Sequence, residues 1–257
     1  MALLEIKGLT KHFGGLSALN NLDLTVKKGE IVGLIGPNGA GKTTAFNVIM
    51  GTFAPSKGKV LFKGKDITGL KPHIIVQKGL VRSFQRTILF SEMTILQNIL
   101  LGFHLAARTG FWGCLFNTAS TRNRQKMAFE KAEEIADFMG LGNIKSQYAK
   151  NLPHGNQRLL GVAIALATNP DLILMDEPVT GMNAEETDSM MGKIRQIRDR
   201  GVTILLVEHD MRLVMNICER LCVLDFGTKI AEGSPEQICK NREVITAYLG
   251  SEYASAS

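Results

Sequence analysis

The chain has 257 residues, of which 45% are hydrophobic, 21% charged and 6% aromatic, a balance typical of a globular protein of one large or two modest domains. No apolar run approaches the ~18 residues that cross a bilayer, and the first residues lack the pattern of a signal peptide, so we expect a cytoplasmic chain without a membrane span. Thirty Lys and Arg stand against 24 Asp and Glu, a mild excess that suits phosphate ligands or an anionic membrane surface, and the absence of a basic block argues against sequence-specific nucleic-acid binding.

Three segments in the first part of the chain, 3–9, 18–26 and 58–67, alternate apolar and polar residues between turns that contain glycine. Alternation of this kind is the pattern of antiparallel strands that bury one face. The segments therefore predict a small antiparallel β subdomain.

The apolar run EIVGLIG, 30–36, leads into the segment GPNGAGKTT and then into a helical pattern. The segment fits G-x-x-x-x-G-K-[ST], a loop that wraps phosphates with backbone N–H groups between a strand and a helix. In this pattern Lys42 reaches the outer phosphates and the hydroxyl of Thr43 binds Mg²⁺. The predicted nucleotide-binding residues are Gly36, Pro37, Asn38, Gly39, Ala40, Gly41, Lys42, Thr43 and Thr44.

The middle of the chain, from about residue 94 to about residue 168, has a different pattern. Apolar residues recur at three- and four-residue steps over 95–103, 125–141 and 157–168. We predict that these helices form a lobe inserted into an α/β core.

A second apolar run, in LILMDEP at 172–178, ends in two acids before a proline. Taken alone, the pattern also fits a core strand that ends in two solvated acids. Beside a phosphate loop it predicts a metal partner, because nucleotide-bound Mg²⁺ needs an oxygen ligand at the carboxyl edge of the sheet. Asp176 is placed for that role through water, which leaves Glu177 to polarise an attacking water.

A third apolar run, VTILLVE at 202–208, precedes His209. The imidazole has two interpretations: it caps or hydrogen-bonds the next helix, or it contacts the γ-phosphate, where charge grows during transfer. Apolar runs that each lead into a loop and a helical pattern are typical of parallel strands buried on both faces.

Together these elements predict an α/β fold, a P-loop NTPase core with an antiparallel β subdomain and an inserted helical subdomain. The core with its β subdomain covers 1–93 and 169–235, the helical subdomain 94–168, and a C-terminal helix and tail 236–257. No repeat of 20 to 50 residues divides the chain further.

The four cysteines, Cys114, Cys218, Cys222 and Cys239, form no C-x-x-C pair. Cys218 and Cys222 are one helical turn apart in an apolar stretch, a spacing that favours packing over metal or disulfide. We expect reduced, structural thiols.

In kind and order, these motifs resemble those of the ATP-binding subunits of ABC transporters over nearly the whole chain. A closer similarity, to the longer ATPase subunit of branched-chain amino acid importers, is carried by LIGPNGAGKTTAFNVIMG, VRSFQRTILFSEMTILQNIL, EPVTGMN, VEHDMRLVM and ITAYLG. The resemblance implies ATP hydrolysis with Glu177 as general base. It also implies adenine stacking by Phe13, a Mg²⁺ shell of Thr43, Gln85 and Asp176, a dimer interface at Thr180–Asn183, and a γ-phosphate switch at His209.

The segment NLPHGNQRLL, 151–160, takes the place of the family's usual Leu-Ser-Gly-Gly-Gln signature. Pro153 replaces the serine whose hydroxyl contacts the γ-phosphate of ATP on the opposite subunit, a hydrogen bond that contributes about 1.5–3 kcal/mol. The helix that follows, expected from Asn156, still offers free N–H groups and a positive end to phosphate. The resemblance therefore assigns His154, Gly155 and Asn156 to the partner's nucleotide, with a weakened contact.

Because a signature segment reaches only the ATP of another subunit, we expect a dimer, of two copies or of this chain with a related ATPase. The resemblance also implies ATP and Mg²⁺ as ligands, two transmembrane permease subunits and, indirectly, an extracytoplasmic solute-binding protein. It implies no nucleic acid, and a peripheral position on the cytoplasmic face of the inner membrane.

Three questions stay open at this point. Relatives with the same architecture import urea, short amides or aromatic acids, so the solute is not determined by the family. The segment 104–125, with Phe111, Trp112, Leu115 and Phe116, either folds back on the helical lobe or contacts a permease. The altered signature also fits an alternative, a regulatory ATP-binding protein with weak or no hydrolysis.

Overall fold

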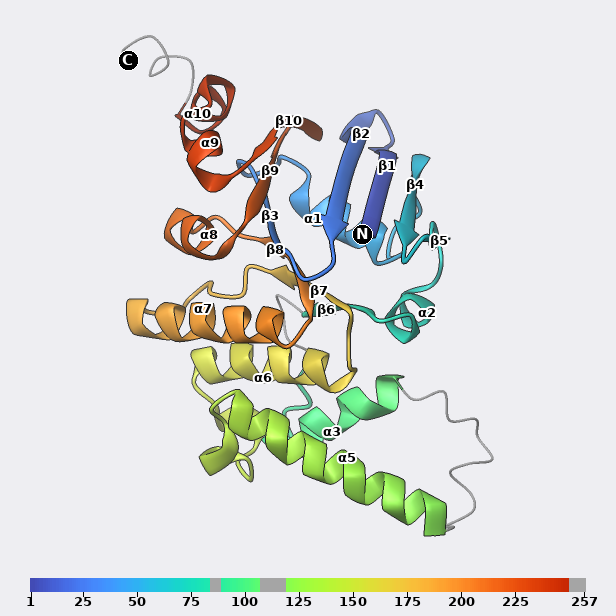
Figure 1. The fold of residues 1–257 in the computed structure, drawn as a ribbon, viewed down its shortest axis with the longest axis vertical. Helices are drawn as coiled ribbons and strands as arrows, with labels where there is room; N and C mark the ends of the chain where they lie inside the picture. The colour runs from blue at the N-terminus through green and yellow to red at the C-terminus, as the bar shows by residue number, and fades with distance from the viewer. Residues whose placement is uncertain (84–88, 107–118, 250–257) are drawn as a thin grey trace.

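The computed structural model describes residues 1–83, 89–106 and 119–249, and two sheets and a set of helices make up this part of the chain (Figure 1). The larger sheet has six strands in the order β10-β9-β3-β8-β7-β6. All neighbouring pairs in it are parallel except β9 and β10. Its strands are β3 (Ile31–Ile35), β6 (Leu80–Ser83), β7 (Leu172–Asp176), β8 (Thr203–Val207), β9 (Arg220–Asp225) and β10 (Thr228–Gly233).

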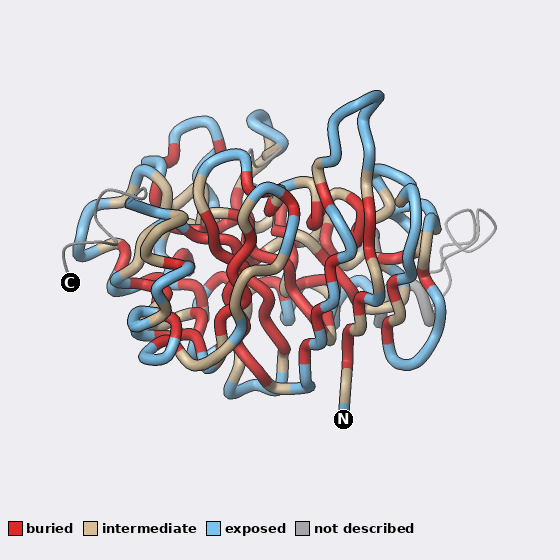
Figure 2. The backbone as a smooth tube through the Cα atoms, turned by 90° about the horizontal axis from the view of Figure 1, so that it is seen from above, coloured by how far each residue is buried: buried red, intermediate tan, exposed pale blue. Residues whose placement is uncertain are grey.

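The central strands of this sheet are buried on both faces, which explains their continuous apolar sequences. Every residue of β3, β7 and β8 is buried, and Figure 2 shows buried residues concentrated along the strands in the middle of the molecule. Successive side chains of a strand point to opposite faces, so each strand contributes to two cores. The α/β fold predicted from the sequence is confirmed.

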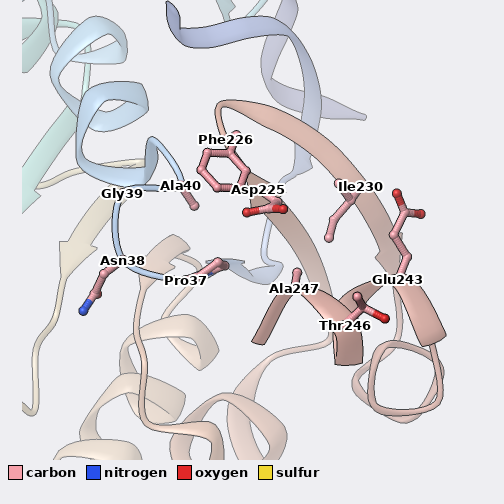
Figure 3. A pocket seen from close by; sticks show the side chains of 10 residues that line it. All are labelled: Pro37, Asn38, Gly39, Ala40, Asp225, Phe226, Ile230, Glu243, Thr246 and Ala247. Carbon is pink, nitrogen blue, oxygen red and sulfur yellow. The ribbon is translucent and has the colours of Figure 1, made fainter. Parts of the chain in front are cut away.

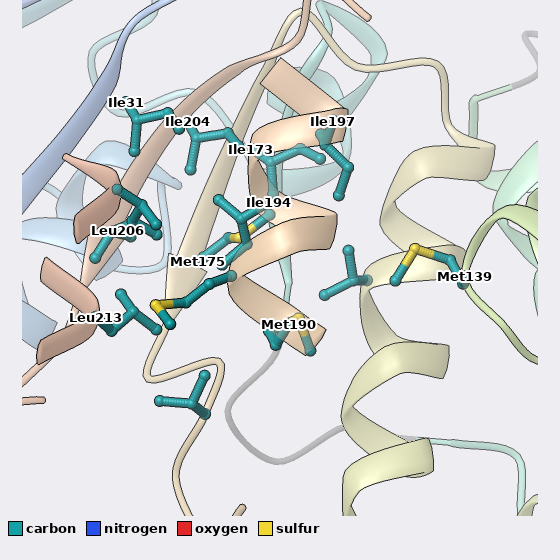
Figure 4. Close-up of a cluster of buried hydrophobic side chains, with 14 of the residues drawn as sticks. Ile31, Met139, Ile173, Met175, Met190, Ile194, Ile197, Ile204, Leu206 and Leu213 are labelled. Atoms are coloured by element: carbon teal, nitrogen blue, oxygen red, sulfur yellow. The ribbon is translucent and has the colours of Figure 1, made fainter. Parts of the chain in front are cut away.

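One core lies between the sheet and the helices α7 (Ala184–Asp199) and α8 (Met211–Ile217). In it the strand residues Ile31, Ile204 and Leu206 share one cluster with Met190 and Ile194 of α7 (Figure 4). The opposite face of the sheet packs on α1 (Lys42–Ile49) and on the second sheet. Phe46 of α1 is fully buried in that second core.

The second sheet is antiparallel, with four strands in the order β2-β1-β4-β5. They are β1 (Ala2–Phe13), β2 (Leu16–Lys27), β4 (Lys57–Phe62) and β5 (Lys65–Asp66). The inward residues of β1 and β2 are buried and most of the others are not, so the alternation in the sequence reflects one buried and one solvated face. This sheet is the β subdomain predicted from the sequence.

The described residues between β6 and β7 include several helices. Three of them pack together, α3 (Ile95–Ala106), α5 (Ala119–Phe138) and α6 (His154–Ala167), and they form the lower lobe in Figure 1. Two 3-10 turns, η1 (Gly142–Ile144) and η2 (Ala149–Asn151), connect α5 to α6. The remaining helices are α2 (Pro72–Gln77), α9 (Pro235–Cys239) and α10 (Arg242–Leu249). In the described ranges no helix combines the length and the apolar character that crossing a membrane requires.

Two local features differ from the sequence-based expectations. Helix α6 begins at His154, two residues before the expected start at Asn156, because Pro153 with φ −54° serves as its N-cap. Cys218 and Cys222 do not share a helix, since Cys218 ends α8 and Cys222 lies in β9. Both thiols are free, and burial raises the pKa of each to about 12, so neither is reactive at neutral pH.

Leu206, fully buried in β8, provides a test of the core. We expect Leu206→Ala to lower the free energy of unfolding by about 2–5 kcal/mol, because the substitution removes buried apolar surface and leaves a cavity. Urea unfolding followed by circular dichroism measures the change. The matched control, Leu249→Ala at a side chain with 59% exposure, should change it by less than about 0.5 kcal/mol, and equal effects of the two substitutions would contradict this core.

Candidate functional site

The predicted site residues meet where three neighbouring parallel strands end. β8 lies between β3 and β7, with Leu34 of β3 and Asp176 of β7 both opposite Val207. The phosphate-loop segment, residues 36–44, follows β3, and Glu177 follows β7 directly. His209 lies two residues beyond the end of β8. The backbone N–H of Glu177 donates to the carbonyl of Val207 at 2.9 Å, which extends the ladder into the site.

The phosphate-loop segment depends on glycine at two positions where a side chain would collide with backbone. Gly36 has φ +148°, and a Cβ there would lie 2.1 Å from the carbonyl oxygen of Leu224. Gly41 has φ +100°, and its Cβ would lie 2.5 Å from the carbonyl oxygen of Ala18. The loop can follow this close path because neither residue has a side chain.

Lys42 is the first residue of α1 and is 9% exposed. Its ammonium donates to the carbonyl oxygens of Gly36 at 2.6 Å and Pro37 at 2.9 Å, so the lysine bridges its own loop. Burial lowers the pKa of Lys42, and the carboxylates of Glu177 and Asp176 oppose that shift. Both carboxylates are therefore close enough to act on the ammonium electrostatically.

Asp176, at the end of β7, is 2% exposed and forms an ion pair through Oδ2 with Arg82 of β6. Arg82 also donates to Oδ1 of Asn47 at 2.7 Å. The second oxygen of Asp176, Oδ1, is buried without a hydrogen-bond partner. A buried acceptor without a partner is costly, and this free carboxylate oxygen beside a phosphate loop fits the oxygen ligands that Mg²⁺ prefers.

Glu177 adopts a left-handed backbone conformation with φ +48°, rare for a residue with a side chain. Its carboxylate accepts from the hydroxyl of Thr180 at 3.3 Å. The Nδ1 atom of His209 lies 3.7 Å from Oε1 of Glu177, and the imidazole is 60% exposed. The sequence-predicted Asp176 and Glu177 thus lie near Lys42. His209 lies beside Glu177, and the side chains of both are partly accessible to solvent.

A cavity of about 470 Å³ lies against the phosphate-loop segment, within the range of about 300–1,000 Å³ typical of small-molecule sites. Phe13, at one side of it, is 40% exposed. The ring of Phe53 supports Phe13 edge-on, with 5.3 Å between the ring centroids, and the Lys11 ammonium lies 4.9 Å from the Phe13 centroid. The lining residues are Phe13, Leu16, Ser17, Ala18, Asn38, Gly39, Ala40, Gly41, Lys42, Thr43, Thr44, Glu177 and Phe226.

The signature segment lies away from this cavity, and its residues are not among those that line it. Pro153 and His154 are exposed at the start of α6, whereas Gly155 is buried against Glu186 of α7, where a Cβ would lie 2.6 Å from Oε1. Gln157 fixes the turn by donating from Nε2 to the carbonyl of Leu152 at 2.9 Å. The helix start is therefore exposed at Pro153 and His154 and does not contribute to the lining of this cavity.

Other predicted residues have different positions. Asn183 is the N-cap of α7, where its side chain accepts from the backbone N–H of Glu186 at 2.9 Å in a capping box. Gln85 lies outside the described residues, and so do Phe111, Trp112, Leu115 and Phe116. Within the described ranges no group of three or more His, Cys, Asp or Glu side chains could hold a metal by itself, so any Mg²⁺ here would need other ligands too.

A second cavity, of about 460 Å³, is lined by the phosphate-loop segment on one side and by α10 and the β9–β10 turn on the other (Figure 3). Burial raises the pKa of Tyr248 in α10, and a hydrogen bond with the backbone of Gly36 opposes the shift. The C-terminal helix therefore contacts the loop directly. The cavity is lined by Pro37, Asn38, Gly39, Ala40, Asp225, Phe226, Ile230, Glu243, Thr246 and Ala247.

Three contributors to the site did not emerge from the sequence: Arg82, Phe53 and Glu208. Arg82 lies in the short strand β6, and a lone basic residue in an apolar run is a weak signal. Glu208 ends an apolar run, where a buried carboxylate and a solvated one look the same in sequence. Phe53 lies in a loop without a motif.

Comparison with known proteins agrees with this geometry. A family model described as "ABC transporter" matches residues 19–180, and one described as "Branched-chain amino acid ATP-binding cassette transporter" matches residues 228–254. The chain is 43% identical over 249 residues to the high-affinity branched-chain amino acid transport ATP-binding protein LivG of Escherichia coli K12, covering 96% of this chain and 98% of LivG. It is 42% identical to BraF of Pseudomonas aeruginosa, with the same coverage.

Solved structures show the same fold. A nucleotide-free ATP-binding cassette from an ABC transporter superimposes with a TM-score of 0.85 at 32% identity, covering 97% of this chain and 100% of that one. The ADP conformation of the cassette MJ1267 gives 0.86 at 32% identity, with 97% and 99% covered. A dimeric cassette, MJ0796 bound to ADP and Pi, gives 0.76 at 25% identity, with 90% and 98% covered. The chain is a member of the ATP-binding cassette family of transporter ATPases, in the group of branched-chain amino acid transport ATP-binding proteins.

Proposed function

We propose that this ATPase binds Mg²⁺-ATP at the edge of its parallel sheet and hydrolyses it to drive a membrane importer of branched-chain amino acids or related small polar or amide solutes. The observation that carries the proposal is the convergence of Lys42, Asp176, Glu177 and His209 on one edge of the sheet, beside a cavity of nucleotide size. Residues 1–93 and 169–235 supply this core, and 94–168 supply the helical subdomain.

The phosphate-loop segment binds the nucleotide in this proposal. Its backbone N–H groups and the amino end of α1 surround the phosphates, Lys42 exchanges its loop carbonyls for the outer phosphates, and Phe13 stacks on the base. Thr43, Gln85 and Asp176 hold Mg²⁺, with Asp176 acting through water. The ion, when bound, neutralises charge that develops on the phosphate oxygens.

Glu177 and His209 act at the reacting end of the nucleotide. The carboxylate of Glu177 orients a water for attack on the γ-phosphorus and accepts its proton. The imidazole of His209 lies 3.7 Å from that carboxylate, and it donates to the γ-phosphate oxygens as they gain charge.

The second half of the site comes from another ATPase subunit. The start of α6, which is exposed at Pro153 and His154, offers backbone N–H groups of His154, Gly155 and Asn156 to the partner's γ-phosphate, and Thr180–Asn183 contact the partner. The dimeric MJ0796 structure supports such an arrangement. The partner is a second copy or a related ATPase.

The pair of ATPase subunits works on two transmembrane permease subunits, with an extracytoplasmic solute-binding protein acting indirectly. This places the chain peripherally on the cytoplasmic face of the inner membrane. The support is the similarity to LivG and BraF, whose names give branched-chain amino acid transport. A regulatory ATP-binding protein with weak or no hydrolysis is the second candidate, and Pro153, which lacks the hydroxyl of the usual signature serine, is the observation that favours it.

Phosphate release by the purified chain, alone and with its sister ATPase, decides between these two candidates. Glu177→Gln should lower turnover by about 10²–10⁴-fold, because the amide cannot accept the proton, while ATP binding persists and size exclusion shows an ATP-trapped dimer. Glu130→Gln, at a carboxylate with 61% exposure, should behave as wild type. Full turnover in Glu177→Gln would exclude Glu177 as the base. The absence of turnover by the wild type, both alone and with its sister ATPase, would favour the regulatory alternative.

Pro153→Ser should strengthen the dimer. The new hydroxyl can donate to the partner's γ-phosphate, a bond of about 1.5–3 kcal/mol, so we expect ATP-dependent dimerisation about ten- to a hundredfold tighter in the Glu177→Gln background. Analytical ultracentrifugation measures the dissociation constant. Pro153→Ala relaxes the backbone equally but adds no donor, so tightening by alanine as well would show that the proline ring, and not the hydroxyl, limits the contact.

The solute can be tested with the complete transporter in proteoliposomes. With the binding protein on the solute side and ATP on the ATPase side, leucine, isoleucine or valine should stimulate ATP hydrolysis and accumulate, because solute-loaded binding protein drives subunit closure. Urea, acetamide and phenylalanine serve as competing solutes. Stimulation of ATP hydrolysis by one of these solutes, without stimulation by the aliphatic amino acids, would show that the transporter carries a different solute.

A further inference from the structure

Glu208 occupies an unusual environment between β8 and His209. Among the described residues it is the one charged side chain with 0% exposure. Burying a carboxylate is costly unless its oxygens are hydrogen-bonded, and the strand before it is entirely apolar. The contacts that compensate this cost therefore indicate what the residue does.

Each oxygen of the Glu208 carboxylate binds a different chain segment. Oε1 accepts from the backbone N–H of Val179 at 3.2 Å, in the loop that follows β7 and carries Glu177. Oε2 accepts from the backbone N–H of His209 at 3.0 Å and of Asp210 at 3.4 Å. One side chain thus joins the loop of the proposed base to the loop of the proposed switch histidine.

The bonds of Glu208 are not needed to build the neighbouring helix. The N-cap of α8 is Asp210, whose own side chain accepts from the N–H of Leu213 at 3.1 Å. Burial raises the pKa of Glu208, and the N–H groups of Val179, Asp210 and His209 oppose that shift. Burial therefore disfavours the charged form of Glu208, whereas the three N–H donors favour it.

The chemistry at this position requires a carboxylate. All the groups that bind Glu208 are N–H donors, and an ionised carboxylate presents acceptors on both oxygens and no donor. A glutamine of the same shape would turn its NH₂ group toward an N–H of one of the two loops. The carboxylate can bind both loops at once, and an amide can bind only one.

We propose that Glu208 is a positioning residue that couples the loop of Glu177 to the loop of His209, so that base and switch move as one unit. The proposal rests on the function proposed above for those two residues. Through Val179 the same coupling reaches Thr180–Asn183, the segment assigned to the dimer interface. Contact with the partner at that segment would then change the position of His209 through the carboxylate of Glu208.

The test is Glu208→Gln in the full chain, with Glu30→Gln as a matched control. Glu30, at the amino end of β3, is 9% exposed and also binds donors with both oxygens, from Arg220 at 2.8 Å and Lys27 at 2.9 Å. The control introduces the same chemical defect away from the site. We expect Glu208→Gln to lower kcat at least tenfold with ATP affinity within twofold of wild type, and Glu30→Gln to lower thermal stability with kcat within twofold.

Hydrogen–deuterium exchange provides a readout that is independent of activity. In Glu208→Gln, exchange should accelerate in peptides covering both 177–183 and 208–212, and Glu30→Gln should leave both unchanged. Wild-type kcat, or faster exchange confined to one of the two segments, would overturn the proposal. If Glu208→Gln does not fold, Glu208→Asp keeps the charge but is one methylene too short to bind both loops, and the same criteria apply to it.

The outcomes separate this proposal from the proposed function. A wild-type chain without ATPase activity, alone and with its sister subunit, would refute the roles of Glu177 and His209. Coupled exchange of the two segments would still be measurable in that protein, and would then show a structural link without a catalytic one.

Discussion

The functional edge of this protein depends on a sheet that is buried on both faces. Because α7 and α8 cover one face and α1 with the antiparallel sheet covers the other, charged groups in the central strands can lie only where the strands end. Parallel pairing of β3, β8 and β7 aligns those ends. The ladder therefore brings together residues that are far apart in the sequence, such as Lys42 and Glu177, without a dedicated scaffold.

In the function proposed above, the site is divided between two chains. The cavity beside the phosphate loop is lined from the core and the β subdomain, whereas the start of α6 belongs to the helical lobe and is exposed at Pro153 and His154. Under that proposal, a complete site needs two surfaces that meet. In it, Pro153 changes the strength of the contact without removing the N–H groups of the helix, since those belong to the backbone.

Much of the fold and of the candidate site could be predicted from the sequence, and there are physical reasons why the other features could not. Buried strands and the phosphate loop have local patterns, so the α/β fold and the positions of Lys42 and Asp176 followed from residue order. The pairing of Arg82 with Asp176 depends on the register between β6 and β7, which no local pattern contains. The helical spacing assumed for Cys218 and Cys222 was wrong, because apolar runs do not distinguish a helix end from a strand start.

Lys42 illustrates how the loop is prepared for repeated use. Its ammonium already donates to two carbonyls of its own loop. In the proposed function, an arriving phosphate therefore replaces existing hydrogen bonds of Lys42 and does not meet an unpaired charge. Binding is then an exchange, in which the net gain is smaller than the gross attraction. Such an exchange also runs in reverse: after the outer phosphate leaves, the carbonyls compete again for the ammonium, and the spent nucleotide is released more readily than from a loop whose lysine had no other partner.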